Sequence, residues 1–256
     1  MPLTRAQWTA RVALAVAAAA VPVHAQTTTA SKPDGIWRGS LSFGGTATGG
    51  NTDSLNVGVN ADAVRQTDRD KLGFYFQDVY ARSTVNGATQ TSAKQVKGGG
   101  RYDHDLTERW YDFAGIDLEK NVPANVRLRI LPQAGLGFHV VKSDPLTFNL
   151  FAGYAYNHQV NYTPPNTIES EAILGEETIH KLTPTTSFHQ RLVLFPSLTQ
   201  SDEYRGQFDA GLVTNIIRSW NLTLTLSDRY DHRPSPGVKR NDYVVFTGIQ
   251  YGWGPR

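Results

Sequence analysis

Alternation of apolar and polar residues constrains the fold of this chain more than any other feature of its sequence. The clearest example is the segment 128–140, where Leu128, Ile130, Pro132, Ala134, Leu136, Phe138 and Val140 occupy every second position. Residues two apart lie on the same face of a β-strand, so this spacing predicts a strand with one apolar face. The same period recurs in the segments 55–63, 148–156, 204–212, 222–226 and 243–253. The chain is therefore predicted to be all-β.

Polar clusters divide these segments into two interleaved sets of connections. The short set is 67–71, 104–109, 142–145, 180–186 and 217–221; the more variable set is 48–53, 85–91, 119–125, 157–168, 199–203 and 232–241. Five turns alternating with six loops predict about twelve strands in an up-and-down order. An even number of strands places both termini at the same end.

The N-terminus predicts export. Arg5 and Arg11 give a positive start, and the apolar stretch 12–23 is shorter than the roughly 20 residues of a membrane-spanning helix. Val23-His24-Ala25 resembles a signal-peptidase site. We expect a cleaved signal peptide over 1–25, a flexible segment over 26–34 and the folded domain over 35–256. A retained N-terminal anchor is the alternative.

Charge and cysteine content fit an exported chain. Removal of Arg5 and Arg11 takes the 25 basic residues to 23, equal to the 23 acidic residues, so the basic pI gives no argument for nucleic acid. Cysteine is absent, which suits passage through an oxidising periplasm. No later stretch is apolar enough for a spanning helix, so strands would have to cross the membrane.

These features together predict a closed antiparallel transmembrane β-barrel in the cell outer membrane. Closure is required because lipid cannot pair the backbone groups of an open sheet edge. Outer-membrane lipid, periplasmic chaperones and the barrel-insertion machinery are the expected partners. A soluble sandwich or a lipocalin-like barrel, with apolar faces inward, is the alternative.

The tryptophans of the mature chain give an independent indication. Trp37 starts the first predicted strand, Trp253 ends the last, and Trp110 and Trp220 directly follow short turns. All four would lie at one end of the barrel. Tryptophan prefers the bilayer interface, so we interpret them as membrane-interface anchors.

Several short motifs resemble one family. Three sets of residues are similar to motifs of the YdiY-like salt-induced outer-membrane proteins, domain-of-unknown-function family 481. They are Trp37-x-Gly39 with Thr48-Gly49-Gly50-Asn51-Thr52; Arg129 with Gly135-x-Gly137-Phe138; and Pro234, Pro236-Gly237-Val238-Lys239, Asp242 and Tyr251. The resemblance covers nearly all of 36–253. It implies a small outer-membrane barrel, linked to salt or envelope stress, with no settled activity. Trp253 is followed by Gly254-Pro255-Arg256, whereas such barrels usually end in an aromatic residue. Either Trp253 serves as the insertion signal from inside the terminus, or the signal is unusual.

The polar faces of the strands carry the candidate site. By alternation the lumen-facing set includes Arg38, Lys97, Arg101, Arg127, Arg129, Arg191, Arg205 and Arg229, with the acids Asp62, Glu169, Glu171, Glu177 and Asp209. One interpretation is a constriction that selects anionic or small polar solutes. The other is a structural network in which these arginines pair with the acids.

Other chemistry has weaker support. Asp103-His104-Asp105 lies in a predicted turn, where Asp is common, and the remaining histidines lack ligand spacing, so we expect neither a metal site nor a cofactor. Strand glycines such as Gly135 and Gly137 are typical of close packing in a barrel wall. No serine motif accompanies His139 or His189, so an enzyme is not expected. Three hypotheses remain: a small channel, a non-conducting structural or surface-binding barrel and, least favoured, a membrane-embedded hydrolase.

Overall fold

The computed structural model describes residues 32–48, 52–85, 88–234, 238 and 240–255. The expected signal peptide and residues 26–31 lie outside the described residues, as does most of the Thr48–Thr52 loop motif. No helix in the described part of the chain is long and apolar enough to cross a membrane. The described residues form twelve strands: β1 (Arg38–Thr48), β2 (Thr52–Gln66), β3 (Asp70–Val85), β4 (Ala88–Asp105), β5 (Trp110–Asn121), β6 (Val126–Lys142), β7 (Leu146–Asn161), β8 (Thr167–Lys181), β9 (Thr186–Pro196), β10 (Tyr204–Ile217), β11 (Trp220–Asp231) and β12 (Asn241–Trp253).

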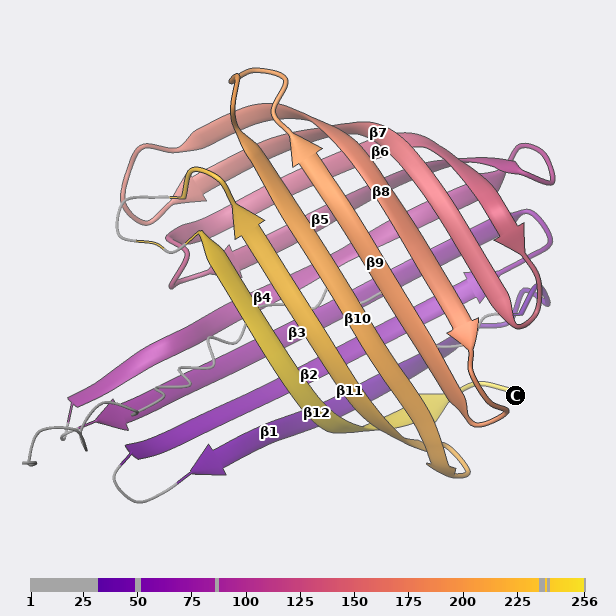
Figure 1. The fold of residues 1–256 in the computed structure, drawn as a ribbon, viewed down its shortest axis with the longest axis horizontal. Coiled ribbons are helices and arrows are strands. Elements are labelled where there is room, and N and C mark those ends of the chain that lie inside the picture. Colours follow the sequence, from indigo (N-terminus) through magenta and orange to yellow (C-terminus); the bar gives the residue numbers. More distant parts are fainter. Residues whose placement is uncertain (1–31, 49–51, 86–87, 235–237, 239, 256) are drawn as a thin grey trace, which may run out of the picture.

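The strands close into one antiparallel barrel. Each strand pairs with its neighbours in sequence, and β1 pairs with β12 from Gly39 opposite Trp253 to Gly44 opposite Gly248. Figure 1 shows the strands running obliquely around the barrel wall. Closure pairs the backbone groups that an open sheet would leave at its two edges. The prediction of a closed all-β barrel with twelve strands is confirmed.

The two ends of the barrel differ in their connections. The short turns, the start of β1 and the end of β12 lie at one end, which we call the turn end; the other end is the loop end. The loop expected over 157–168 is wrong in extent, because β7 continues to Asn161 and β8 begins at Thr167. Asn157 and Gln159 extend the inward face, where they hydrogen-bond to Glu171 and Asn161. A polar run therefore does not end a strand when its side chains find partners in the interior.

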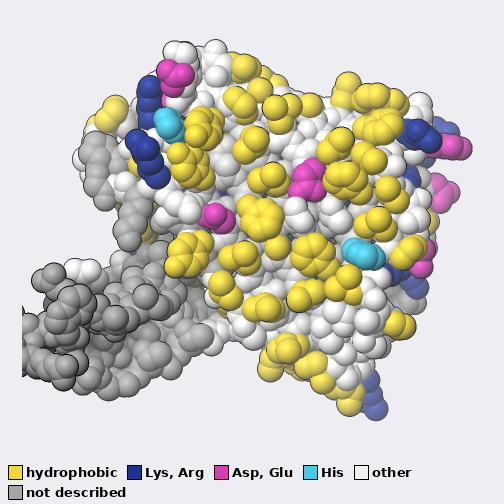
Figure 2. Space-filling view, viewed as in Figure 1, with side chains coloured by type: hydrophobic (Ala, Val, Ile, Leu, Met, Phe, Trp, Pro, Cys, Tyr) yellow, Lys and Arg dark blue, Asp and Glu magenta, His cyan; other side chains and the backbone are white. Residues whose placement is uncertain are grey.

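Apolar side chains cover the outside of the wall. Leu41, Phe76, Leu136, Leu194 and Leu224 are among many large hydrophobic residues that are more than a third exposed. The space-filling view shows such side chains spread over the visible strands (Figure 2). Trp37, Trp110, Trp220 and Trp253 all lie at the turn end with exposed side chains.

One carboxylate on this outer face is held by its neighbours. Glu176 on β8 accepts hydrogen bonds from Gln190 Nε2 on β9, at 2.6 Å, and from Thr178 Oγ1, at 3.3 Å. Its register neighbours are Leu150 and Leu192. An unpaired carboxylate among apolar groups raises the free energy of the folded state. The hydrogen bonds from Gln190 and Thr178 explain why Glu176 can lie at this outward position.

Candidate functional site

Every strand of the barrel contributes buried side chains to the interior. Because the wall is a single sheet, a side chain can be deeply buried only on the inside. Every strand contributes at least one inward residue that is no more than 9% exposed: Ser40, Asp62, Gln77, Lys97, Asp117, Leu131, Ala155, Ile173, Val193, Asp209, Ser227 and Gln250, in the order β1 to β12. Hydrogen bonds from Gln250 to Ser40 and from Ser40 to Asp62 carry this band across the β1–β12 closure. The side chains of this band have little access to solvent.

An apolar cluster occupies the side of the interior formed by β5 to β9. It consists of Tyr111, Phe113, Leu131, Phe151, Ala155, Ile173, Val193 and Phe195. Gly135 and Gly137 on β6 make room for it, because a Cβ at Gly137 would lie 2.0 Å from the Tyr111 ring and one at Gly135 would lie 2.8 Å from Phe113. The close-packing interpretation of these two glycines agrees with this geometry. They admit aromatic rings, so the space they leave is filled.

Two arginines lie against this cluster in the half of the interior nearer the turns. The Arg101 guanidinium is 4.0 Å from the centre of the Phe113 ring, and it donates to Asp103 at 2.6 Å. The Arg191 guanidinium is 5.2 Å from the Phe151 ring. Arg191 stands opposite Glu177 on β8 and Asp209 on β10 in the strand register. Stacked guanidinium and aromatic groups attract one another and fill space, so these two arginines help to close the interior near the turns.

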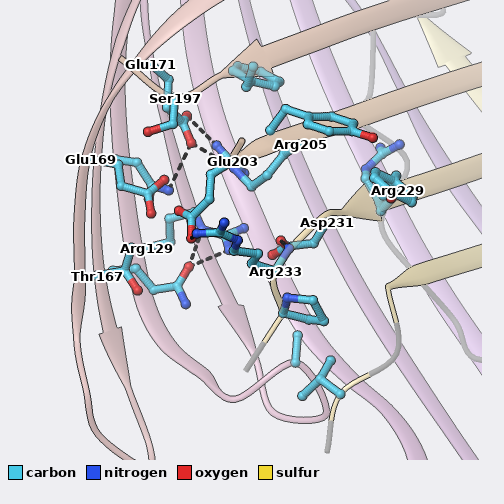
Figure 3. A pocket seen from close by; sticks show the side chains of 18 of the residues that line it. Arg129, Thr167, Glu169, Glu171, Ser197, Glu203, Arg205, Arg229, Asp231 and Arg233 are labelled. Atoms are coloured by element: carbon cyan, nitrogen blue, oxygen red, sulfur yellow. Dashed lines mark hydrogen bonds and ion pairs between the residues drawn. The ribbon is translucent and has the colours of Figure 1, made fainter. Parts of the chain in front are cut away.

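The half of the interior nearer the loops contains a cavity of about 390 Å³. It is lined by side chains from the strands and by residues of the β7–β8, β9–β10 and β11–β12 loops, which places it at the loop end. Figure 3 shows the carboxylates of Glu169, Glu171 and Glu203 on one side of it and Arg229 on the other. Phe195 belongs to both the cavity lining and the apolar cluster, so the cluster forms part of the cavity floor.

Three ion pairs line this cavity. Arg129 Nη1 is 2.7 Å from Glu119 Oε2, Arg205 Nη2 is 2.5 Å from Glu171 Oε2, and Arg233 Nη1 is 3.3 Å from Glu203 Oε1. Arg205 also donates through Nε to Glu171, giving a two-point contact with a carboxylate that is 1% exposed. Arg129 donates further to Gln159. Three of the arginines in the cavity wall are therefore matched by carboxylates that also line the cavity.

The other predicted lumen residues lie in different surroundings. Lys97 is buried 5.9 Å from the Tyr75 ring centre and also lines the cavity. Asp209 accepts from Arg229 at 2.7 Å and from Ser227. Asp62 accepts a hydrogen bond from Ser40. These residues belong to the packed band or to its junction with the cavity.

Arg38 and Arg127 stand apart from this network. Arg38 lies at the turn end, where it pairs with Asp34 at 2.5 Å and donates to the Pro255 carbonyl at 2.8 Å. These contacts link the segment before β1 to the segment after β12. The hydrogen bond from Arg38 holds the pKa of the Asp34 carboxyl well below its usual range. Arg127 is exposed at an irregularity in the β6–β7 register, between Val126 and Leu128.

The sequence pattern does not predict some of the residues that line the interior. Phe113 and Phe151 carry no charge that marks a lumen position, and Asn157 falls in the segment 157–168 expected to be a loop, although each alternates with outward residues on its strand. Strand 110–118 is apolar on both faces, and this signal could have indicated an internal cluster. Glu203 lies between strands, so no periodicity points to it. Within the described residues, no group of three or more His, Cys, Asp or Glu could hold a metal ion.

A closed up-and-down barrel with an apolar exterior and a polar, ion-paired interior defines the class of transmembrane β-barrels. The sequence assigns the chain more narrowly. It belongs to the family described as "Protein of unknown function, DUF481", whose profile matches residues 41–253. The family resemblance read from the motifs is thus confirmed. Comparison with curated proteins finds no match.

Two solved structures align with most of this chain at low sequence identity. An outer membrane channel from Pseudomonas putida F1 aligns with a TM-score of 0.50 and 12% identity, covering 90% of this chain and 99% of that one. The translocator domain of the autotransporter NalP from Neisseria meningitidis aligns with a TM-score of 0.47 and 14% identity, covering 86% and 88% of the two chains. At these identities the comparison with the channel supports the barrel architecture alone.

Proposed function

We propose that this protein is an integral outer-membrane barrel that is closed to free diffusion and acts through its loop end. The membrane location is supported by the apolar outer face and by the four tryptophans at the turn end. The signal peptide expected over 1–25 would deliver the chain to the periplasm.

The observation that carries the closed state is the packed band. All twelve strands contribute an inward side chain with at most 9% exposure, so water has little access to these side chains. An open porin needs a water-filled passage along the whole barrel. Of the hypotheses drawn from the sequence, the geometry therefore favours the non-conducting, surface-binding barrel.

The ion pairs argue against a simple anion-selective constriction. Selectivity by a ring of guanidinium groups requires positive charge that remains available to the passing ion. Arg129 and Arg205 are instead engaged by Glu119 and Glu171. These pairs support the interpretation of the charged interior as a structural network.

A gated channel is the second candidate, and one observation favours it. Among the described residues, the buried atoms Arg101 Nη1, Arg191 Nε, Gln77 Oε1 and Gln95 Oε1 have no hydrogen-bond partner. Unpaired buried polar atoms raise the free energy of the closed state, which lowers the cost of opening. A membrane potential or a ligand could then shift the protein toward a conducting form.

Planar-bilayer recording tests the proposal. We expect the refolded wild-type barrel to insert with no stable conductance steps at moderate voltage, with heat-modifiable gel mobility as the control for folding. Stable conductance steps from the unmodified protein would overturn the closed state. If steps appear only after a change of voltage, replacement of Arg129 by Gln should reduce anion preference in the gated channel.

A further inference from the structure

The loop-end cavity has an uneven distribution of charge. Glu169 and Glu171 project inward from β8, and Glu203 reaches the same wall from the β9–β10 loop. These three carboxylates meet two guanidinium groups in direct ion pairs, because Arg205 binds Glu171 and Arg233 binds Glu203. Glu169 instead shares a hydrogen bond with the carboxyl group of Glu203, which requires a proton on one of the two groups. This wall has one more acid than its paired bases.

An unpaired acceptor lies at the same place. Asn157 on β7 is opposite Glu169 in the strand register, lines the cavity and is only 2% exposed. Its Nδ2 donates to Glu171 Oε1 at 3.3 Å, while its Oδ1 has no hydrogen-bond partner. A buried carbonyl oxygen without a donor is costly, and a bound ligand that supplies an N–H group would remove that cost.

The chemistry of this wall selects a donor-rich cation. The groups on this wall that can accept from a ligand are the Glu169 carboxyl, the Asn157 Oδ1 and the Glu203 carboxyl, which Arg233 also contacts. A primary ammonium group has three N–H donors and no acceptor, which matches such a set. A metal ion fits less well, because no cluster of acidic or histidine ligands among the described residues has the geometry to hold one.

We infer that the loop-end cavity is a binding site for small solutes with a protonated primary amine, held by Glu169, Glu203 and Asn157. The cavity volume of about 390 Å³ admits a molecule of the size of an aliphatic diamine. Arg233 is half exposed, so its side chain can leave Glu203 as the ligand enters. Binding at this site does not depend on whether the barrel conducts.

Calorimetric titration of the refolded full barrel domain with putrescine tests the site. We expect saturable binding to the wild type, weakened about tenfold or more in Glu169→Gln, since a charge-assisted hydrogen bond is lost. The matched control is Glu177→Gln, which neutralises an inward glutamate of the same strand outside the cavity lining and should leave putrescine affinity unchanged. Tetramethylammonium, which has the charge but no N–H donor, should bind weakly or not at all.

Asn157→Ala provides a second test that keeps all three carboxylates. It should weaken putrescine binding severalfold, and gel mobility should show that each variant is folded. The inference is overturned if putrescine fails to bind at millimolar concentration, if Glu169→Gln binds as tightly as the wild type, or if Asn157→Ala does so. It is also overturned if calcium ions displace putrescine at equal concentration, which would identify a metal site.

Discussion

The two halves of the barrel interior use the same charged residue types with opposite results. Near the turns, Arg101 and Arg191 lie against Phe113 and Phe151, and the space is filled. Near the loops, Arg129 and Arg205 pair with glutamates, and a cavity remains. The arginine content of a lumen therefore does not determine whether it is open. More aromatic rings face the arginines of the half near the turns, where Phe113 and Phe151 lie against Arg101 and Arg191, than those of the half near the loops, where Phe195 lies against Arg205.

Removal of one aromatic ring from the filled half should have the largest effect. Phe151 is buried between Phe113 and two guanidinium groups, so Phe151→Ala should lower the free energy of unfolding by about 3–5 kcal/mol. Urea titration of the barrel in detergent measures this change. The same variant should give conductance in bilayers where the wild type gives none, because the filled half would open.

The adjacent residue provides the control for this prediction. Leu150 faces outward and is 45% exposed, so Leu150→Ala removes a side chain without opening the interior. It should destabilise the barrel less and leave it non-conducting. Equal effects at positions 150 and 151 would remove the distinction between a filled interior and a lipid-facing surface.

Loss of a cavity arginine should have the next largest effect. Arg205→Ala would leave Glu171, which is 1% exposed, without its ion-pair partner. An uncompensated buried carboxylate costs about 3 kcal/mol, which urea titration at neutral pH would show. Lys181→Ala, which breaks an exposed pair with Asp144, should change stability by less than about 1 kcal/mol. A small effect at Arg205 would mean that water in the cavity already solvates Glu171.

The sequence predicts the strands of this barrel better than the contacts between the side chains inside it. Alternation indicates which residues face inward, and the turn clusters give the strand number, because both depend on local geometry. Which arginine meets which acid depends on register across several strands. Arg205 and Glu171 are 34 positions apart and lie on β10 and β8, two strands apart. Arg127 departs from the simple alternation because the β6–β7 register shifts between Val126 and Leu128, and no residue type marks that shift.

Glycine substitution tests how tightly the filled half is packed. In Gly137→Ala the new Cβ would lie 2.0 Å from the Tyr111 ring, so the ring or the backbone must move, at a cost of about 1–3 kcal/mol. Gly206→Ala is the control, since its nearest neighbours would be 3.6 Å away and its effect should stay within about 0.5 kcal/mol. Thermal denaturation in detergent would rank the two. A destabilising Gly206→Ala with a neutral Gly137→Ala would contradict the packing described for the aromatic cluster.

The smallest effect is expected at Arg127, which lies two residues from Arg129 on the same strand. Arg129 bridges Glu119 and Gln159 in the loop half, whereas Arg127 is exposed at the register irregularity. Arg127→Ala should therefore change the free energy of unfolding by less than about 0.5 kcal/mol. Arg129→Ala should cost several times more, because it leaves Glu119 without the guanidinium that neutralises it. Parallel urea titrations compare the two variants directly. Equal losses would mean that Arg127 also turns into the lumen, so that the cavity wall carries more positive charge than the ion pairs account for.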